Sequence, residues 1–471
     1  MQLMKKIERI LMPMLLGILS GCSGFLDKTP FLQLTDTSIF SSPERVEGAV
    51  KGVYTQMKEN TFIGSKTYAC IENMGDDMNN VSGNGYECIF SYNMEVGKET
   101  RDNYQTWTGA YLTIHSANTV LENLATAQEV VGDSYSRYLQ EVKFCRALSY
   151  YYLANLYGKP YMLDGGSSLA VPLRLKAEKS PAGNNLRQST VAEVYAQVLE
   201  DTREYEALPV PGTPDYSINR ANQAAVHMLR MRVYMAMEQW QQAIAEGEAV
   251  QGYELTPEVT APFLSSPSCI ESIFSFPFEG TNNGGGRQYA ACYFYATGNS
   301  LVLDRESGIH SDFYPLYNLP ADARVSALIG VASSGQYVLT KFTDGITYLD
   351  WVPIFRYAET LLNLAECYWQ MHQEEKAIAV LAKVRRRALP AADDPLQLHT
   401  LSGAALGEAI YLERRAELVG EAIRALDIKR RGETFIKKKG TPAEFSCAPA
   451  SSGYTWPIPT IETANNKAIE E

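Results

Sequence analysis

The chain has 471 residues, of which 45% are hydrophobic and 20% are charged. These proportions are those of a globular protein with a sizeable buried core, and they exclude disorder as the main state. The formal net charge of -12 argues against a nucleic-acid partner, because phosphate binding needs a basic surface.

The N-terminal residues have the pattern of an export signal. A positive stretch at 5–9 is followed by an apolar run over 10–19, too short to span a bilayer, and then by Leu-Ser-Gly ahead of Cys22. That ending is typical of a lipobox, where a bacterium acylates the cysteine sulfur and cleaves the chain before it. We therefore expect residues 1–21 to be a signal peptide, Cys22 to carry lipid, and residues 22–40 to form a tether. Several acyl chains anchor firmly, at about 0.8 kcal/mol per buried methylene.

The cysteines leave the redox state open. Lipidation of Cys22 leaves seven cysteines, an odd number that cannot all pair within one chain. Cys145 and Cys367 lie on apolar helical stretches and are expected to be buried thiols. Cys70 and Cys88 flank a loop-like stretch that a disulfide would clip, and the sequence is compatible with one disulfide or none. No CxxC motif or Cys/His cluster indicates a metal site.

Helical patterns cover most of the remaining chain. The first helix is expected to begin at Ser41-Ser42-Pro43-Glu44 and to run to about Lys58, because a Ser cap and an early Pro favour a helix start. Further helical stretches are predicted over 106–127, 135–157, 191–207, 224–250, 361–384 and 407–430.

Two of these stretches have the spacing of tetratricopeptide repeats. The stronger match is Leu361, Leu364, Ala365, Tyr368, Ala377, Leu381 and Val384. Small residues at these offsets let two antiparallel helices approach closely, and the larger ones fill the gaps between successive pairs. The match over 224–250 is weaker because Gly247 replaces a large residue. The predicted fold is mainly α, a single domain over 41–471 built on paired helices.

Two segments lack helical periodicity. Residues 60–103 are rich in Gly, Asn, Asp and Tyr and are predicted to be loop with short strands. Residues 254–350 contain three consecutive glycines and a cluster of Phe and Tyr. A stretch this long without helical period is usually functional or disordered, and its aromatic content argues against disorder. This loop-rich insert is therefore the expected binding surface.

Several motifs along the chain resemble one known family. They are Phe25-Leu26-Asp27 with Pro30; Trp107, Tyr111, Ile114, Ala117 and Asn118; Arg146-Ala147 with Tyr157-Gly158; Arg220, Ala224, Arg232, Tyr234 and Trp240; Arg356-Tyr357-Ala358-Glu359 with Ala365-Glu366; Glu413-Arg414-Arg415 with Glu417-Leu418, Glu421, Arg424, Asp427-Ile428 and Arg431; and Pro457-Ile458-Pro459 with Glu462 and Asn466. Over nearly its whole length the chain resembles the SusD/RagB family. Gly420, Ala422 and Leu426 depart from the family pattern, so packing around that helix is expected to differ.

The resemblance implies a function that composition alone does not. Members of this family are lipoproteins of the outer membrane that face the cell exterior. They bind nutrient oligosaccharides or polysaccharides and deliver them to a SusC-like TonB-dependent transporter, without a cofactor and without catalysis. Some relatives bind peptides, so a peptide-binding uptake lipoprotein is an alternative. A protein-interaction scaffold that uses the repeats is another, and a lipid-anchored glycosidase is a third.

The expected ligand contacts come from the two irregular segments. Tyrosine combines a flat apolar face with a hydroxyl, which suits sugar rings. The candidate residues are Tyr86, Tyr92, Asn282, Arg287, Tyr289, Tyr293 and Tyr295, with Asp76 and Asp77 as hydrogen-bonding partners.

Catalytic patterns are absent from the sequence. It has no HExxH, GxSxG or P-loop motif, and its five histidines are scattered. Adjacent carboxylates such as Asp76 and Asp77 seldom flank one sugar bond from opposite sides. The carboxylates and arginines of 413–431 recur three and four residues apart, which indicates a buried charge network that ties helices together. We predict no catalytic residue and no metal.

Overall fold

The computed structural model describes residues 39–58, 62–81, 88–279, 301–303, 319–333, 335–344, 346–438 and 441–469, with only the backbone at 301–303. Cys22 and the predicted signal peptide lie outside the described residues. Within those residues, no helix has both the length and the apolar character needed to cross a bilayer.

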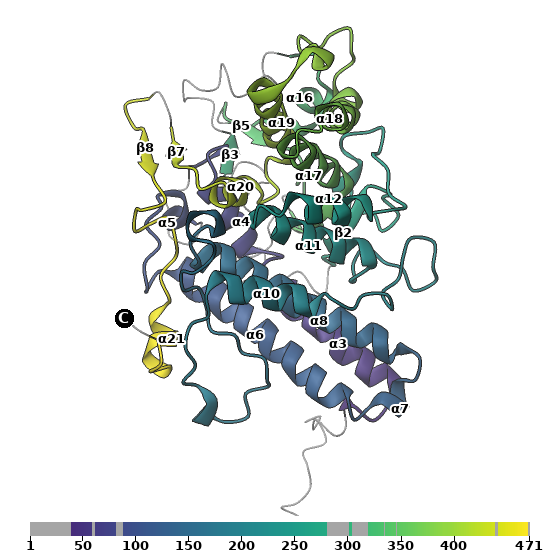
Figure 1. Ribbon diagram of the computed structural model, residues 1–471, viewed down its shortest axis with the longest axis vertical. Helices are drawn as coiled ribbons and strands as arrows, with labels where there is room; N and C mark the ends of the chain where they lie inside the picture. Colours follow the sequence, from purple (N-terminus) through teal and green to yellow (C-terminus); the bar gives the residue numbers. More distant parts are fainter. Residues whose placement is uncertain are drawn as a thin grey trace, which may run out of the picture.

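The fold is mainly α, as predicted, with short two-stranded ladders (Figure 1). Its helices are α3 Pro43–Lys58, α4 Lys66–Met74, α5 Ile89–Tyr92, α6 Arg101–Leu124, α7 Gln128–Val131, α8 Ser134–Tyr157, α9 Tyr161–Asp164, α10 Val191–Asp201, α11 Gln223–Ala236, α12 Trp240–Glu248, α16 Ala323–Leu328, α17 Tyr357–Gln370, α18 Glu374–Ala388, α19 Gly403–Leu418, α20 Arg424–Arg430 and α21 Thr460–Asn465. Short 3-10 turns are Pro181–Gly183, Ala261–Phe263 and Leu398–Thr400. The strand pairs, all antiparallel, are β1 Met78–Asn80 with β3 Leu301–Leu303, β2 Ser272–Phe276 with β6 Val352–Arg356, β4 Ile329–Val331 with β5 Tyr337–Leu339, and β7 Phe435–Lys437 with β8 Phe445–Cys447.

Helices α3, α6, α8 and α10 form the lower layer in Figure 1, with α8 at its centre. Every residue of α8 from Phe144 to Tyr157 is buried. A helix that is apolar on all sides belongs in the middle of a helix layer, where it has neighbours all round. Gly158 ends α8 in an extended conformation.

The upper layer consists of helix pairs, α11 with α12 and α17 with α18, followed by α19. This arrangement confirms the repeat pattern predicted from the spacing. A side chain at Gly247 of α12 would meet Leu364 and Met231 at 2.8 Å, so glycine is the residue that lets α12 approach α17. The glycine that weakened the repeat match is therefore a packing requirement of this pair.

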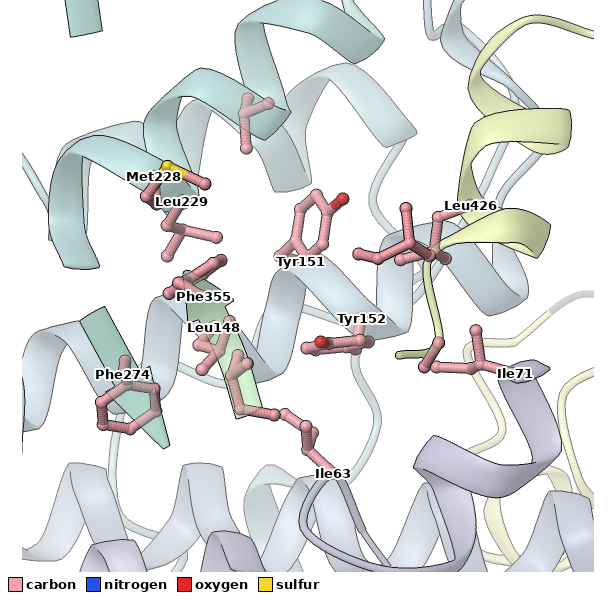
Figure 2. Close-up of a cluster of buried hydrophobic side chains, with 14 of the residues drawn as sticks. Ile63, Ile71, Leu148, Tyr151, Tyr152, Met228, Leu229, Phe274, Phe355 and Leu426 are labelled. Atoms are coloured by element: carbon pink, nitrogen blue, oxygen red, sulfur yellow. The ribbon is translucent and has the colours of Figure 1, made fainter. Parts of the chain in front are cut away.

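A hydrophobic cluster joins the two layers (Figure 2). Phe274 of β2 packs edge-on against Phe144 of α8, with ring centroids 5.4 Å apart, and lies beside Phe355 of β6. Tyr151 and Tyr152 of α8 extend the cluster toward the yellow α20. Both strands are buried along their whole length, so they act as a wedge between the helix layers.

Two sequence predictions are wrong at particular elements. Residues 66–74 were expected to be loop, but they form α4, in which every residue is buried. This helix has only nine residues, and buried polar residues such as Lys66, Glu72 and Asn73 interrupt its apolar positions, so no clear helical period stands out in the sequence. The single helix expected over 407–430 is broken between Leu418 and Arg424, because Gly420 and Ala422 have φ of 80° and 56°. Their backbone N–H groups donate to the buried Glu72 carboxylate, both at 2.9 Å.

A buried charge network lies beside this break, as the sequence indicated. The Arg356 guanidinium donates to Glu417 at 2.6 Å, to Glu421 at 2.7 Å and to Glu271 at 2.9 Å. Arg387 also pairs with Glu271 and Glu417. These partners come from different elements, so the network joins β6, α18 and α19 instead of running along one helix.

Further cations complete the network. Arg324 donates to Glu413 at 2.7 Å and to Glu417 at 3.0 Å, and the Lys341 ammonium lies 2.7 Å from Glu421. Burial by itself raises the pKa of Glu417, but the surrounding guanidinium groups outweigh it and hold that pKa well below its ordinary value. The carboxylate is therefore charged at neutral pH, as its partners require.

Replacing one member of the network tests how far the fold depends on it. Arg356→Leu leaves Glu271, Glu417 and Glu421 buried with an incomplete set of cations. We expect the free energy of unfolding to fall by about 3–5 kcal/mol, the usual cost of breaking a buried pair. Chemical denaturation at pH 7, followed by circular dichroism, measures it.

The matched control is Arg203→Ala. Arg203 pairs with Glu200 at 3.0 Å, but both side chains are more than half exposed. This variant should change the free energy of unfolding by no more than about 0.5 kcal/mol. An equally small loss in Arg356→Leu would contradict the importance given to the network.

Candidate functional site

The β1–β3 ladder brings the two irregular segments together. Asn80, near the end of β1, pairs with Leu301, the first residue of β3. In an antiparallel pair the chain leaves one strand where it enters the other. The end of β1 therefore lies beside the start of β3. Residues 82–87 come after β1 and residues 280–300 come before β3. These are the segments in which most of the candidate ligand residues were predicted.

The candidate residues divide into two groups. Tyr92, Asp76 and Asp77 are described by the structure. Tyr86, Asn282, Arg287, Tyr289, Tyr293 and Tyr295 lie outside the described residues.

Tyr92, the last residue of α5, is 3% exposed. Its hydroxyl donates to the Asn79 side-chain oxygen of β1 at 2.8 Å. Its ring packs edge-on against Phe445, with centroids 6.1 Å apart, and the Lys437 ammonium lies 4.4 Å from its centre. A ring with both faces covered offers no surface to a sugar. The structure therefore gives Tyr92 a supporting role under β1 in place of the predicted ligand contact.

Asp76 and Asp77 are bound by arginines of the C-terminal helices. Asp76 accepts from Arg424 at 2.6 and 3.0 Å, and Asp77 accepts from Arg415 at 2.6 and 3.0 Å. Burial raises the pKa of Asp76, but Arg415 and Arg424 outweigh it and hold that pKa below its usual range. The pair fastens the start of β1 to α19 and α20. Asp77 is 0% exposed, so it anchors the site and does not reach a ligand.

The described edge of this face carries exposed apolar side chains. Val81, directly after β1, is 42% exposed, and Phe90 of α5 is 37% exposed. Val81 follows β1 directly, so it lies where the two irregular segments adjoin, and α5, which carries Phe90, packs on β1. Phe90 was not among the predicted residues. Its position two residues before Tyr92 was the available signal, since residues two apart on an α-helix lie on nearly opposite sides.

The sequence did not predict a cavity that lies beside α6. A cavity of about 200 Å³ lies between α6, α21 and the segment 174–184, with Tyr111, Arg174 and Glu462 in its wall. Arg174 donates to Glu462 at 2.9 Å, and the Trp107 ring N–H donates to the same carboxylate at 3.3 Å. These polar groups satisfy one another. Glu462 belongs to the C-terminal motif quoted above, which was the signal that could have located the cavity.

The neighbouring segment 173–186 encloses a larger groove of about 500 Å³. Asn466 holds this segment to the C-terminus, because its side chain accepts from the Leu186 N–H at 3.0 Å and donates to the Leu186 carbonyl at 2.8 Å. The elements that line the cavity and the groove, α6, α21 and the segment 173–186, lie in the lower half of Figure 1, apart from β3. The C-terminal motif thus acts as a clamp on the scaffold.

Comparison with known proteins identifies the family of each half of the chain. Residues 24–235 match a family described as starch-binding and associating with the outer membrane, and residues 274–471 match the SusD family. Among characterised relatives, a SusD-like protein of Formosa agariphila is 22% identical, with 88% of this chain and 87% of that protein aligned.

Solved structures agree with this. A SusD superfamily protein of Bacteroides fragilis is 45% identical, with a TM-score of 0.87, covering 92% of this chain and 100% of that one. A laminarin-binding SusD-like protein has a TM-score of 0.71 at 20% identity, covering 91% and 99%. The first of these proteins is similar in both sequence and fold, and the second is similar in fold alone.

The contacts of Asp76 with arginines predict that the free energy of unfolding depends on pH. Asp76 has a folded-state pKa below its unfolded value of about 3.9, so it contributes stability above that value and loses it as the pH falls toward the lower, folded-state pKa. Asp76→Asn should lower the free energy of unfolding at pH 7 by about 2 kcal/mol, the worth of a charged hydrogen bond. It should also flatten the decline of stability between about pH 5 and pH 2.

Urea denaturation at several pH values measures both effects. Glu95→Gln is the control, because the Glu95 carboxylate is exposed and accepts from the neighbouring Asn93 amide at 3.3 Å. A variant at Asp76 whose acid decline equals that of the wild type would contradict the anchoring role.

Proposed function

The chain belongs to the SusD family, and from this premise we propose that it binds a nutrient oligosaccharide or polysaccharide at the face around the β1–β3 ladder. The observation that supports this position is the pairing of Asn80 with Leu301, which brings the ends of two segments far apart in sequence to one edge. Tyr86 is in one of these segments, and Asn282, Arg287, Tyr289, Tyr293 and Tyr295 are in the other.

The chemistry of these residue types fits a glycan. The axial C–H groups of a sugar ring pack on an aromatic face, while Asn and Arg side chains bond its hydroxyls. The laminarin-binding relative supports a saccharide as the ligand class. Phe90 and Val81 supply apolar surface at the described edge of the same face.

The rest of the proposal concerns location and partner. Cys22 carries lipid, residues 22–40 tether the domain to the outer membrane on the exterior side, and the bound glycan passes to a SusC-like TonB-dependent transporter. The match of residues 24–235 to an outer-membrane-associating family supports this location. The protein binds and releases its ligand without bond cleavage, since Asp76 and Asp77 at the start of β1 are held by arginines.

Affinity electrophoresis tests the binding. Soluble protein that starts after Cys22 is run through gels containing plant, host or microbial polysaccharides. We expect retardation by one of them, lost when Tyr289, Tyr293 and Tyr295 are changed to Ala. At about 1 kcal/mol for each stacked ring, the triple variant should bind about 100-fold more weakly.

Matched variants locate the face. Phe90→Ala should weaken retardation by the same glycan, whereas Leu112→Ala should not, although Leu112 on α6 is similarly exposed at 47%. Equal effects of the two would contradict the proposed position. Binding of peptides with no retardation by any glycan would replace the saccharide with a peptide, and release of shorter sugars would contradict binding without cleavage.

A further inference from the structure

Two cysteines on different elements lie together in the core. Cys70 is on α4 and Cys88 directly precedes α5, and both are 0% exposed. Their sulfur atoms and a carboxylate oxygen of Asp102 on α6 all lie within 4.8 Å of one another. The structure has both sulfurs as free thiols.

The charges around the sulfurs favour a covalent bond over a metal ion. The Lys66 ammonium lies 3.1 Å from Asp102, and the other carboxylate oxygen accepts from Ser91 at 2.8 Å. A divalent cation bound to the two sulfurs and Asp102 would face this ammonium across a single carboxylate, in a site closed to water. A disulfide is neutral, so it leaves the ion pair between Lys66 and Asp102 intact.

The backbone at Cys88 directs its sulfur toward α4. Cys88 has φ of 61°, in the left-handed region that few residues other than glycine adopt. Its carbonyl accepts from the Tyr92 N–H at 3.0 Å, which closes the single turn of α5. Its sulfur lies 3.8 Å from the Lys66 carbonyl oxygen on α4. The left-handed backbone conformation of Cys88 thus places its sulfur against α4, the helix that carries Cys70.

We propose that Cys70 and Cys88 form a disulfide when the chain folds in an oxidising medium, closing a covalent loop over residues 71–87. This loop contains β1, so the bond fastens one half of the ladder at its base. With glutathione disulfide as oxidant, a thiolate attacks it to give a mixed disulfide and one glutathione. The second cysteine then displaces the other glutathione, so two thiols lose two protons and two electrons and one S–S bond forms.

The timing of the bond follows from burial. Burial raises the pKa of the Cys88 thiol well above its ordinary value, so the reactive thiolate is scarce once the fold has closed. Oxidation therefore precedes the closure of α4 against α6. Afterwards, the same burial shields the bond from reductant.

The test needs no glycan, so its outcome is independent of the proposed function. The full chain is unfolded, reduced, and refolded with mixtures of reduced and oxidised glutathione. Free thiols are then blocked with iodoacetamide before digestion. We expect a mass-spectrometric peptide that links Cys70 to Cys88, and a midpoint of thermal unfolding raised by on the order of 5 °C over the reduced chain.

Matched variants assign the bond. Cys70→Ser and Cys88→Ser should each abolish the linked peptide and the temperature shift. Cys367→Ser removes a buried thiol of α17 and should leave both unchanged. If refolding is incomplete, the same mixtures are applied to the natively purified chain in sub-denaturing urea, where local opening exposes α4.

Three results would overturn the inference. One is alkylation of both thiols at redox potentials that oxidise ordinary cysteine pairs to structural disulfides. Another is a bond from either cysteine to a different partner. The third is one equivalent of zinc bound by the native chain with both thiols retained and released when either is changed to Ser.

Discussion

The structure depends on the complete burial of the Arg356 guanidinium among three carboxylates. Burying each ion costs several kcal/mol, which is offset only when every hydrogen bond of the set is made. Arg356 ends β6 and precedes α17, while its partner Glu271 directly precedes β2 and its partner Glu417 belongs to α19. None of these elements satisfies its charges alone. The upper helix pairs and the β2–β6 wedge must therefore assemble together.

The candidate binding face rests on this network through one turn. Residues 419–423 follow directly from α19, and their N–H groups hold the carboxylate of Glu72 on α4. The pKa of Glu72 is raised to about 7. Burial and the nearby Asp77 carboxylate raise it, and the two N–H groups oppose them only in part. Asp76 and Asp77, which follow Glu72 after the end of α4, bind arginines of α19 and α20. The start of β1 is thus set by side chains from the opposite end of the sequence.

This arrangement separates scaffold from specificity. The supports of the ladder, which include Tyr92, Glu72 and Asp77, are buried and bonded, while the segments that leave the ladder carry the predicted ligand residues. Such a division lets loops change without loss of the fold, which is how rigid scaffolds serve many ligands. The proposed Cys70–Cys88 bond would add a covalent brace to α4, on the side that faces α6. Helix α4 would then be held by the Glu72 contacts on one side and by sulfur on the other.

The sequence by itself determined helices that have one apolar and one polar face, such as α6 and α18, because the 3.6-residue period is written in their side chains, and it determined the α17–α18 pair through its repeat spacing. It also indicated that the charges of 413–431 form a buried network. Only the tertiary structure decided that α4 is a helix, since its buried polar residues Lys66 and Glu72 find their partners in other elements, Asp102 of α6 and the turn after α19. It alone showed that the helix after Leu418 breaks, because the Glu72 carboxylate that binds the turn lies about 350 residues away. Likewise, Tyr92 and Asp77 are supports because neighbours distant in sequence cover them, and residue type carries no record of such neighbours.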